Sequence, residues 1–257
     1  HKARVIMVFG TKGGCGRTTI ATNLAEALVS DGHSRVCLVD LNLHSGDIGI
    51  CLQVDPVKTI TDALGMQGGL DAQGGESVVT RYKDRFDLLL APTQPADAEF
   101  IGAPLVHDFL TILGELYDYV VIDAPSTFSD VALTCLDSAD TYVLVGTLDV
   151  LSLKNMRICL DTLDALGYPR SRWTVVLNRC DARVGLAVED FEEILGVHID
   201  VRLPSSREVP LSVNRGRSLY SANSRHPFSR SIGELARHVA GATRPEPKRG
   251  RRLRVAS

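Results

Sequence analysis

The feature that most constrains the fold is a glycine-rich loop between an apolar segment and a helical pattern. Val5–Phe9 is typical of a buried strand, and the run Gly10-Thr11-Lys12-Gly13-Gly14-Cys15-Gly16-Arg17-Thr18-Thr19 follows it directly. Glycines let backbone N–H groups turn inward toward an anion, and the next helix adds partial positive charge at its N-terminus. This context predicts a phosphate-binding loop; the alternative is a glycine-rich turn without a ligand.

The loop predicts a site for ATP or ADP together with Mg²⁺. The hydroxyl of Thr18 is placed to bind the metal, and Arg17 occupies the position where such loops usually carry lysine. Arginine presents a wide planar fork and lysine a compact charge, so Arg17 is expected to pair with phosphate less suitably for phosphoryl transfer. The expected nucleotide contacts are Gly13, Gly14, Cys15, Gly16, Arg17, Thr18 and Thr19.

Short apolar runs alternate with helical patterns along the chain. Such alternation predicts an α/β fold with a mostly parallel β-sheet flanked by helices on both faces. The expected strands are Arg4–Phe9, Arg35–Val39, Phe86–Leu90, Tyr119–Ile122, Thr141–Val145, Trp173–Leu177 and His198–Leu203. The clearest helices are Thr18–Val29, Leu151–Leu166 and Ser231–Val239, and Gly65–Gly75 is expected to be a loop.

Length and composition favour one globular domain, residues 1–243, followed by a basic tail at residues 244–257 that we expect to be disordered. None of the six cysteines has zinc-site spacing, and the pattern is typical of a reducing cytoplasm. The net charge of −3 gives no global attraction to nucleic acid. The chain begins with His1 and Lys2, which suggests that a further domain precedes it.

The segment Lys12–Thr19 resembles the deviant Walker A loop of the MinD/ParA superfamily of P-loop NTPases. The resemblance implies a nucleotide-sandwich homodimer. In that arrangement Lys12 is the signature lysine, which reaches the phosphates held by the partner chain.

Two strand-end carboxylates fit further motifs of that superfamily. Asp40 is expected near the metal, and Asp123 resembles the Walker B aspartate that holds Mg²⁺ through water. Asn42 stands where the superfamily has a water-positioning aspartate, and an amide orients water but does not accept its proton at neutral pH. Asp47 is a possible substitute. For Asp40, the alternative is a turn residue at the end of a strand.

Two later positions resemble the superfamily's adenine contacts. Asn178 follows an apolar strand, and Pro204 follows the next one. The resemblance implies that Asn178 hydrogen-bonds the base and that the backbone at Pro204 closes over it. The alternative for Asn178 is a cap at the end of a strand.

Three stretches resemble the TadZ/CpaE branch of the superfamily. They are Asp40–Asp47, Ala91–Glu99, and the combination of Leu166–Pro169, Leu177–Asp181 and Val213–Gly216. Members of that branch localise the Flp (Tad) pilus assembly machinery at bacterial poles, often lack the Walker A lysine, and often carry an N-terminal receiver-like domain. The resemblance implies the pilus secretion ATPase and inner-membrane platform proteins as partners.

Three other functions remain open. A MinD-like septum-site regulator needs a C-terminal membrane helix, and Pro245 and Pro247 in a tail poor in large apolar residues do not form one. A ParA-like partition ATPase needs a basic surface, which in the sequence only the tail supplies, so we expect no specific nucleic acid. A scaffold with a degenerate site is the third, because Arg17 and Asn42 both weaken hydrolysis. We expect slow or absent ATP turnover. For the basic tail, a solvated, disordered end is the favoured interpretation, and weak contact with anionic membrane is the alternative.

Overall fold

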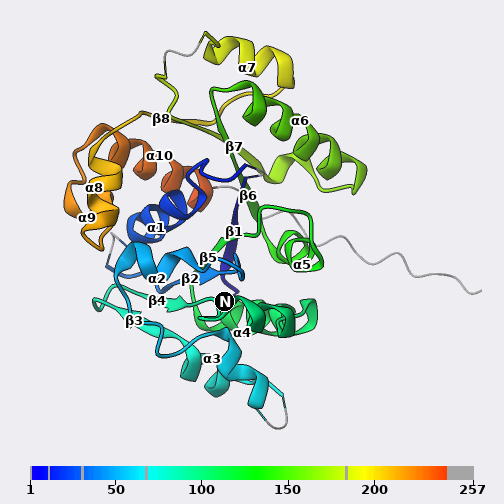
Figure 1. Ribbon diagram of the computed structural model, residues 1–257, viewed down its shortest axis with the longest axis vertical. Helices are drawn as coiled ribbons and strands as arrows, with labels where there is room; N and C mark the ends of the chain where they lie inside the picture. The colour runs from blue at the N-terminus through cyan, green and yellow to red at the C-terminus, as the bar shows by residue number, and fades with distance from the viewer. Residues whose placement is uncertain (1, 11, 30–31, 67–68, 183–184, 242–257) are drawn as a thin grey trace, which may run out of the picture.

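The computed structural model describes residues 2–10, 12–29, 32–66, 69–182 and 185–241. Helices and strands alternate along these residues (Figure 1). The strands are β1 (Arg4–Phe9), β2 (Val36–Asp40), β3 (Thr80–Tyr82), β4 (Phe86–Leu89), β5 (Tyr119–Asp123), β6 (Thr141–Thr147), β7 (Trp173–Asn178) and β8 (Val201–Leu203). The α-helices are α1 (Arg17–Leu28), α2 (Asp47–Leu52), α3 (Ala72–Val78), α4 (Ala103–Leu116), α5 (Asp130–Ser138), α6 (Val150–Ala165), α7 (Val188–Leu195), α8 (Glu208–Asn214), α9 (Leu219–Ala222) and α10 (Pro227–Gly241), and the 3₁₀ segments are η1 (Ile60–Gly65), η2 (Pro95–Phe100) and η3 (Arg170–Arg172).

One eight-stranded sheet organises the molecule, in the order β3-β4-β2-β5-β1-β6-β7-β8. Every pairing is parallel except that of β3 with β4, so the predicted mostly parallel sheet is confirmed. Because parallel strands end at the same edge, the carboxyl ends of β2, β5, β1 and β7 lie together. Asp40 and Asp123 are direct register partners at this edge, so the two motif carboxylates are neighbours.

Helices cover both faces of the sheet and bury one apolar core on each. The first core contains side chains of α4, α5, α6 and α7, including Phe109, Leu136 and Phe191. The second contains apolar side chains of α1, α2 and α10, and within α1 all nine residues from Ile20 to Leu28 are buried. Figure 1 shows α1 and α10 on one side of the strands and α4 and α5 on the other. The central strands, buried on both faces, are therefore apolar almost without interruption.

Several sequence expectations need correction. Gly65–Gly75 was expected to be a loop, but α3 begins inside it, because Asp71 caps the helix by accepting a hydrogen bond from the Gly74 N–H. His198–Leu203 was expected to be a strand, but only Val201–Leu203 pairs with β7. The edge strand β3 and helices α2, α4, α5, α7, α8 and α9 were not identified individually.

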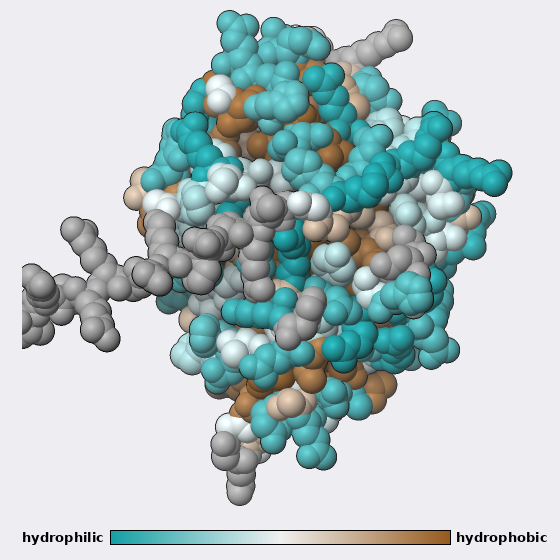
Figure 2. Space-filling view, turned by 180° about the vertical axis from the view of Figure 1, so that it is seen from behind, coloured by the Kyte–Doolittle hydropathy of each residue, from teal (hydrophilic) through white to brown (hydrophobic). Residues whose placement is uncertain are grey.

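Among the described residues, no helix is both long and apolar enough to cross a membrane. Figure 2, which views the molecule from behind, shows a mostly hydrophilic face with smaller hydrophobic patches toward both ends of the long axis. The basic tail at residues 244–257 and Thr11 of the loop lie outside the described residues, so the structure leaves those expectations untested.

Candidate functional site

The glycine-rich loop leaves β1 and enters α1 at the centre of the sheet edge. Gly14 has φ of 74° and Gly16 has φ of 101°, conformations that favour glycine. The side chain of Asn178, from the end of β7, donates from Nδ2 to the Cys15 carbonyl oxygen at 2.9 Å. A Cβ atom at Gly16 would collide with the same Asn178 nitrogen. The sequence therefore sets the shape of the loop, and Asn178 braces it from a neighbouring strand.

Thr18 and Asp123 join the loop to the central strand β5. The Thr18 hydroxyl donates to Asp123 Oδ2 at 2.6 Å, and the other carboxylate oxygen, Oδ1, is buried without a hydrogen-bond partner. Buried polar atoms without partners are rare, and one at a motif position indicates a missing ligand or water.

Asp40 lies beside Asp123 and is equally buried. Burial, and then the negative charge of Asp123, raise the pKa of Asp40 well above the ordinary carboxyl range. Burial also raises the pKa of Asp123, although the hydrogen bond from Thr18 and the charge of Arg17 oppose the shift. Two buried carboxyl groups side by side favour a bound cation, because a cation removes their mutual repulsion.

These residues fit Mg²⁺ held together with a nucleotide. Within the described ranges, no group of three or more His, Cys, Asp or Glu side chains forms a metal site by itself. Mg²⁺ prefers oxygen ligands and commonly uses one or two protein groups together with waters and substrate phosphates. Thr18, Asp123 and Asp40 supply suitable oxygens at one place, and the remaining ligands would come from phosphate and water.

Asp40 also organises the loop that follows β2. Its Oδ1 accepts from the Asn42 N–H at 3.2 Å, and its Oδ2 accepts from the Ile48 N–H at 3.0 Å. The side chain of Asn42 donates to the Ser45 hydroxyl at 2.5 Å, so its amide is committed within the loop. Asp47 begins α2 on the same loop, and its charge raises the pKa values of both Asp40 and Asp123. The predicted residues Asp40, Asn42 and Asp47 are thus brought together.

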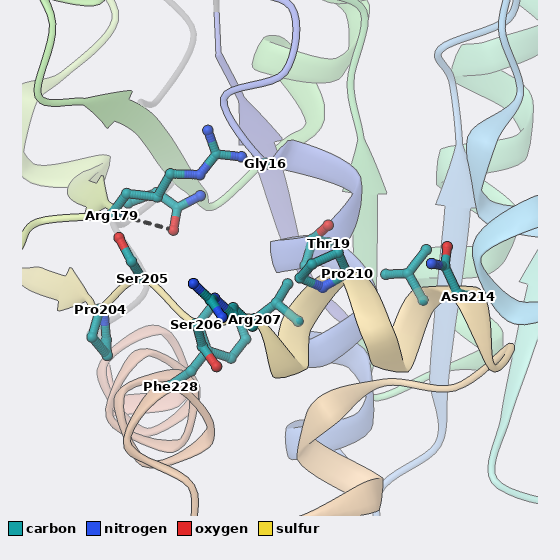
Figure 3. A pocket seen from close by; sticks show the side chains of 13 residues that line it. Gly16, Thr19, Arg179, Pro204, Ser205, Ser206, Arg207, Pro210, Asn214 and Phe228 are labelled. Atoms are coloured by element: carbon teal, nitrogen blue, oxygen red, sulfur yellow. Dashed lines mark hydrogen bonds between the residues drawn. The ribbon is translucent and has the colours of Figure 1, made fainter. Parts of the chain in front are cut away.

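A pocket of about 580 Å³ adjoins the loop on the β7–β8 side (Figure 3). Its lining comes from the loop, from the ends of β7 and β8, from α8 and from α10: Gly16, Thr19, Asn178, Arg179, Pro204, Ser205, Ser206, Arg207, Val209, Pro210, Val213, Asn214 and Phe228. Both predicted base contacts, Asn178 and Pro204, line it. The volume lies in the range of small-molecule pockets, and the mixed apolar and polar lining is typical of them.

Arg17 has a hydrogen-bond partner outside the loop. Its Nη1 donates to the backbone carbonyl oxygen of Ala124 at 2.6 Å, immediately beyond β5. The arginine therefore ties the first turn of α1 to the segment after the Walker B-like strand. No sequence signal specified this partner.

Lys12 forms an ion pair that the sequence analysis missed. Its Nζ lies 2.8 Å from Asp149 Oδ2, and each side chain is about one-third exposed. Asp149 also caps α6 by accepting from the Ser152 N–H at 2.9 Å and accepts from the Thr147 hydroxyl at 2.7 Å. Desolvation raises the pKa of Asp149, but the hydrogen bonds from Lys12, Thr147 and Ser152 outweigh it and lower the pKa to about 2. The sequence offered one signal for Asp149: it lies two residues beyond the end of strand β6, at the edge of the sheet where the loop also lies.

Comparison with known proteins gives a consistent result. The sequence profile of a family described as "AAA domain" matches residues 3–168. A septum site-determining protein MinD from Thermotoga maritima is 27% identical over 248 residues, covering 92% of this chain and 88% of the relative. The antiactivator FleN of Pseudomonas aeruginosa is 24% identical, covering 97% of this chain and 91% of the relative.

Solved structures share the fold over nearly the whole chain. A ParA family ATPase from Chlorobium tepidum superposes with a TM-score of 0.85 at 26% identity, covering 91% of this chain and 99% of the other. The MinD protein from Pyrococcus horikoshii, solved with Mg-ADP, gives a TM-score of 0.79 at 20% identity and covers 95% of this chain and all of the other.

Proposed function

We propose that this chain, which belongs to the AAA-domain family and to the MinD/ParA superfamily of P-loop ATPases, is a positioning factor. Its action depends on ATP, which it hydrolyses slowly. In this proposal ATP–Mg²⁺ joins two copies face to face. The resulting dimer organises Flp (Tad) pilus assembly machinery at the inner face of the cell membrane. MinD and ParA proteins are relatives of this chain, whereas the pilus role is the finer inference.

One observation carries the nucleotide-binding part of the proposal. The base pocket, the glycine-rich loop and the Thr18–Asp123 pair form a continuous line along the carboxyl edge of the sheet. The buried Asp123 Oδ1 at the end of that line accepts no hydrogen bond and lies on the carboxylate that binds Thr18, so it is available to a cation, which favours a working site over a degenerate scaffold.

Lys12 supports the dimer. Its ammonium is partly exposed and is held by Asp149 at the surface rather than directed into its own loop. Val150 and Leu151, which follow Asp149 at the start of α6, are 74% and 64% exposed, so apolar side chains are available at the surface next to Asp149 in the chain. A partly exposed cation within apolar surface is suited to an interface with the second chain's phosphates.

Slow hydrolysis is supported by Arg17 and Asn42. The guanidinium of Arg17 donates to the Ala124 carbonyl oxygen and the amide of Asn42 donates to Ser45, so each group already has a partner within the protein. Phosphoryl transfer depends on positioning and charge, and misplaced groups reduce its rate.

The pilus assignment rests on the TadZ/CpaE-like stretches, and two of the three are neighbours in space. The Asp40–Asp47 loop meets the Ala91–Glu99 segment where a Cβ at Gly46 would lie 3.3 Å from the Ala91 side chain. These two stretches therefore belong to one contiguous part of the molecule.

A pull-down with the tagged chain tests the assignment. The bait is the wild type with ATP–Mg²⁺, and the preys are a purified pilus secretion ATPase, the pilus inner-membrane platform proteins and a purified MinC. Retention of pilus proteins in an ATP-dependent manner is the expected result. Retention of MinC alone would replace the pilus proposal with a septum-site function.

The last helix of the described residues, α10, packs its apolar face into the core. Phe228, Ile232 and Leu235 are buried there, so this face is not available for insertion into a membrane.

A ParA-like function is the second candidate, because exposed basic residues occur outside the tail. Residues 204–241 contain two acidic residues, Glu208 and Glu234. The same stretch contains six exposed arginines: Arg207, Arg215, Arg217, Arg225, Arg230 and Arg237. Salt-dependent binding of a random-sequence DNA duplex, measured by fluorescence anisotropy, would favour partition over pilus assembly.

A further inference from the structure

The end of β7 carries an arginine that the sequence motifs did not select. Arg179 has φ of 54°, and its N–H donates to Asn178 Oδ1 at 3.0 Å. A positive φ is uncommon for a residue other than glycine, asparagine or aspartate, and strained positions of this kind cluster at functional sites. Figure 3 shows the Arg179 side chain extending from the end of β7 toward Gly16 of the loop.

Gly16 marks the junction between the two parts of the site. It belongs to the phosphate loop, and it also lines the base pocket. A nucleotide whose base lies near Asn178 and Pro204, and whose terminal phosphates lie in the loop, must pass Gly16 with its ribose and α-phosphate. Arg179 is exposed, and within the described residues no ion pair of its guanidinium is recorded. Its charge is available to an anion at this junction.

We infer that Arg179 is a nucleotide-binding residue whose guanidinium pairs with the α-phosphate of the nucleotide held by the same chain. A guanidinium offers planar, paired donors that match two phosphate oxygens, and such charge-assisted bonds are stronger than neutral ones. Asn178 gives the position its precision, because the same side chain braces Cys15 of the loop and holds the Arg179 N–H. The inference rests on the proposed binding of ATP.

Arg230 provides a matched control. It carries the same charge and is exposed, but it lies on α10 and does not line the pocket. The experiment measures the affinity of the full chain and of its Arg179→Ala, Arg179→Lys and Arg230→Ala variants for AMP, ADP and ATP by calorimetry. Adenosine binding is followed by NMR titration, and circular dichroism confirms that each variant is folded.

Arg179→Ala is expected to weaken AMP, ADP and ATP alike, by about tenfold, and to leave adenosine unchanged. The affinities of Arg179→Lys should fall between those of the wild type and Arg179→Ala, and Arg230→Ala should change the affinity for each phosphate-bearing ligand by less than about threefold. Equal losses in both alanine variants would mean a general positive potential and overturn the inference.

Two other results would also overturn it. A loss that extends to adenosine would assign Arg179 to the base, and a loss confined to ATP would assign it to the terminal phosphate of either chain. If the wild type binds ATP and Arg179→Ala binds it equally well, only this inference fails. If the wild type binds no adenine nucleotide, the proposed function fails as well.

Discussion

Arg17 Nη1 and the Ala124 carbonyl oxygen lie 2.6 Å apart, which joins the first residue of α1 to the backbone immediately after β5. The contact gives the arginine a structural partner in the segment that follows Asp123. The stem of the same side chain stays close to the loop, because a Cβ added at Gly10 would lie 3.2 Å from Arg17 Cγ. The replacement of the usual lysine therefore changes the shape of the charged group and gives it a backbone partner.

The first prediction concerns hydrolysis. The wild type should release phosphate far more slowly than about 1 s⁻¹, the low end of ordinary enzyme rates. The Arg17→Lys, Asn42→Asp double variant should be at least about tenfold faster, because it restores a compact cation and a carboxylate near the attacking water. A phosphate-release assay at saturating ATP–Mg²⁺ measures both rates. If the double variant binds ATP normally and gains no rate, Arg17 and Asn42 are not the cause.

The second prediction uses two glycines of one loop. Gly16→Ala should destabilise the protein by about 2 kcal/mol or more, because the new Cβ meets the Asn178 side chain and φ is 101°. Gly13→Ala should cost less than about 1 kcal/mol, since a Cβ atom at this position would have open space within 4 Å. Urea unfolding of the nucleotide-free proteins gives both values. Equal costs would show that Asn178 does not shape the loop.

The third prediction concerns the Lys12–Asp149 pair. Asp149→Asn keeps a cap for α6 and removes the negative charge. It should lower the free energy of unfolding by about 0.5–1 kcal/mol at pH 7, as expected for an ion pair that is one-third exposed. Because the pKa of Asp149 is lowered to about 2, this stabilisation is present above about pH 4 and is lost as the pH falls toward 2. Urea unfolding at pH 7 and pH 3 should show the difference shrinking.

Lys12→Met supplies the control for that pair. Combined with Asp149→Asn in a double-mutant cycle, it should give a coupling energy of about 0.5–1 kcal/mol at pH 7. A coupling energy near zero would mean that the contact contributes nothing to the monomer.

The fourth prediction concerns the metal. Asp123→Asn keeps an oxygen acceptor for Thr18 and removes one of two adjacent buried carboxylates, so the nucleotide-free protein should be no less stable than the wild type. The increase in ATP affinity produced by Mg²⁺ should fall by at least about tenfold, because the carboxylate is the charged protein group nearest Thr18. Calorimetry with and without Mg²⁺ tests this. An unchanged Mg²⁺ effect would exclude Asp123 from the metal site.

Much of this arrangement was predictable because parallel strands deliver their carboxyl ends to one edge. Asp40, Asp123 and Asn178 each end an apolar strand, so recognising the strands was enough to place them near the loop. The helix Thr18–Val29 was recognisable for a related reason, since its apolar residues recur with helical spacing and are buried.

The partners of individual side chains were not predictable. The Arg17–Ala124 and Lys12–Asp149 contacts join residues more than a hundred positions apart, and each depends on one rotamer of a long side chain. The left-handed conformation of Arg179 carried no local signal either, since arginine rarely adopts it. The short strand β3 was missed because three residues with an exposed centre show too little alternation.

If ATP joins two copies of the chain, the mass of the purified protein in solution should depend on nucleotide, and light scattering with and without saturating ATP–Mg²⁺ measures it. The protein should be a monomer without nucleotide and a dimer with it, and Lys12→Ala should weaken dimerisation more than it weakens ATP binding. A wild-type monomer at saturating ATP would exclude a dimer joined by ATP. A dimer of the same mass in both conditions would place the interface away from the nucleotide.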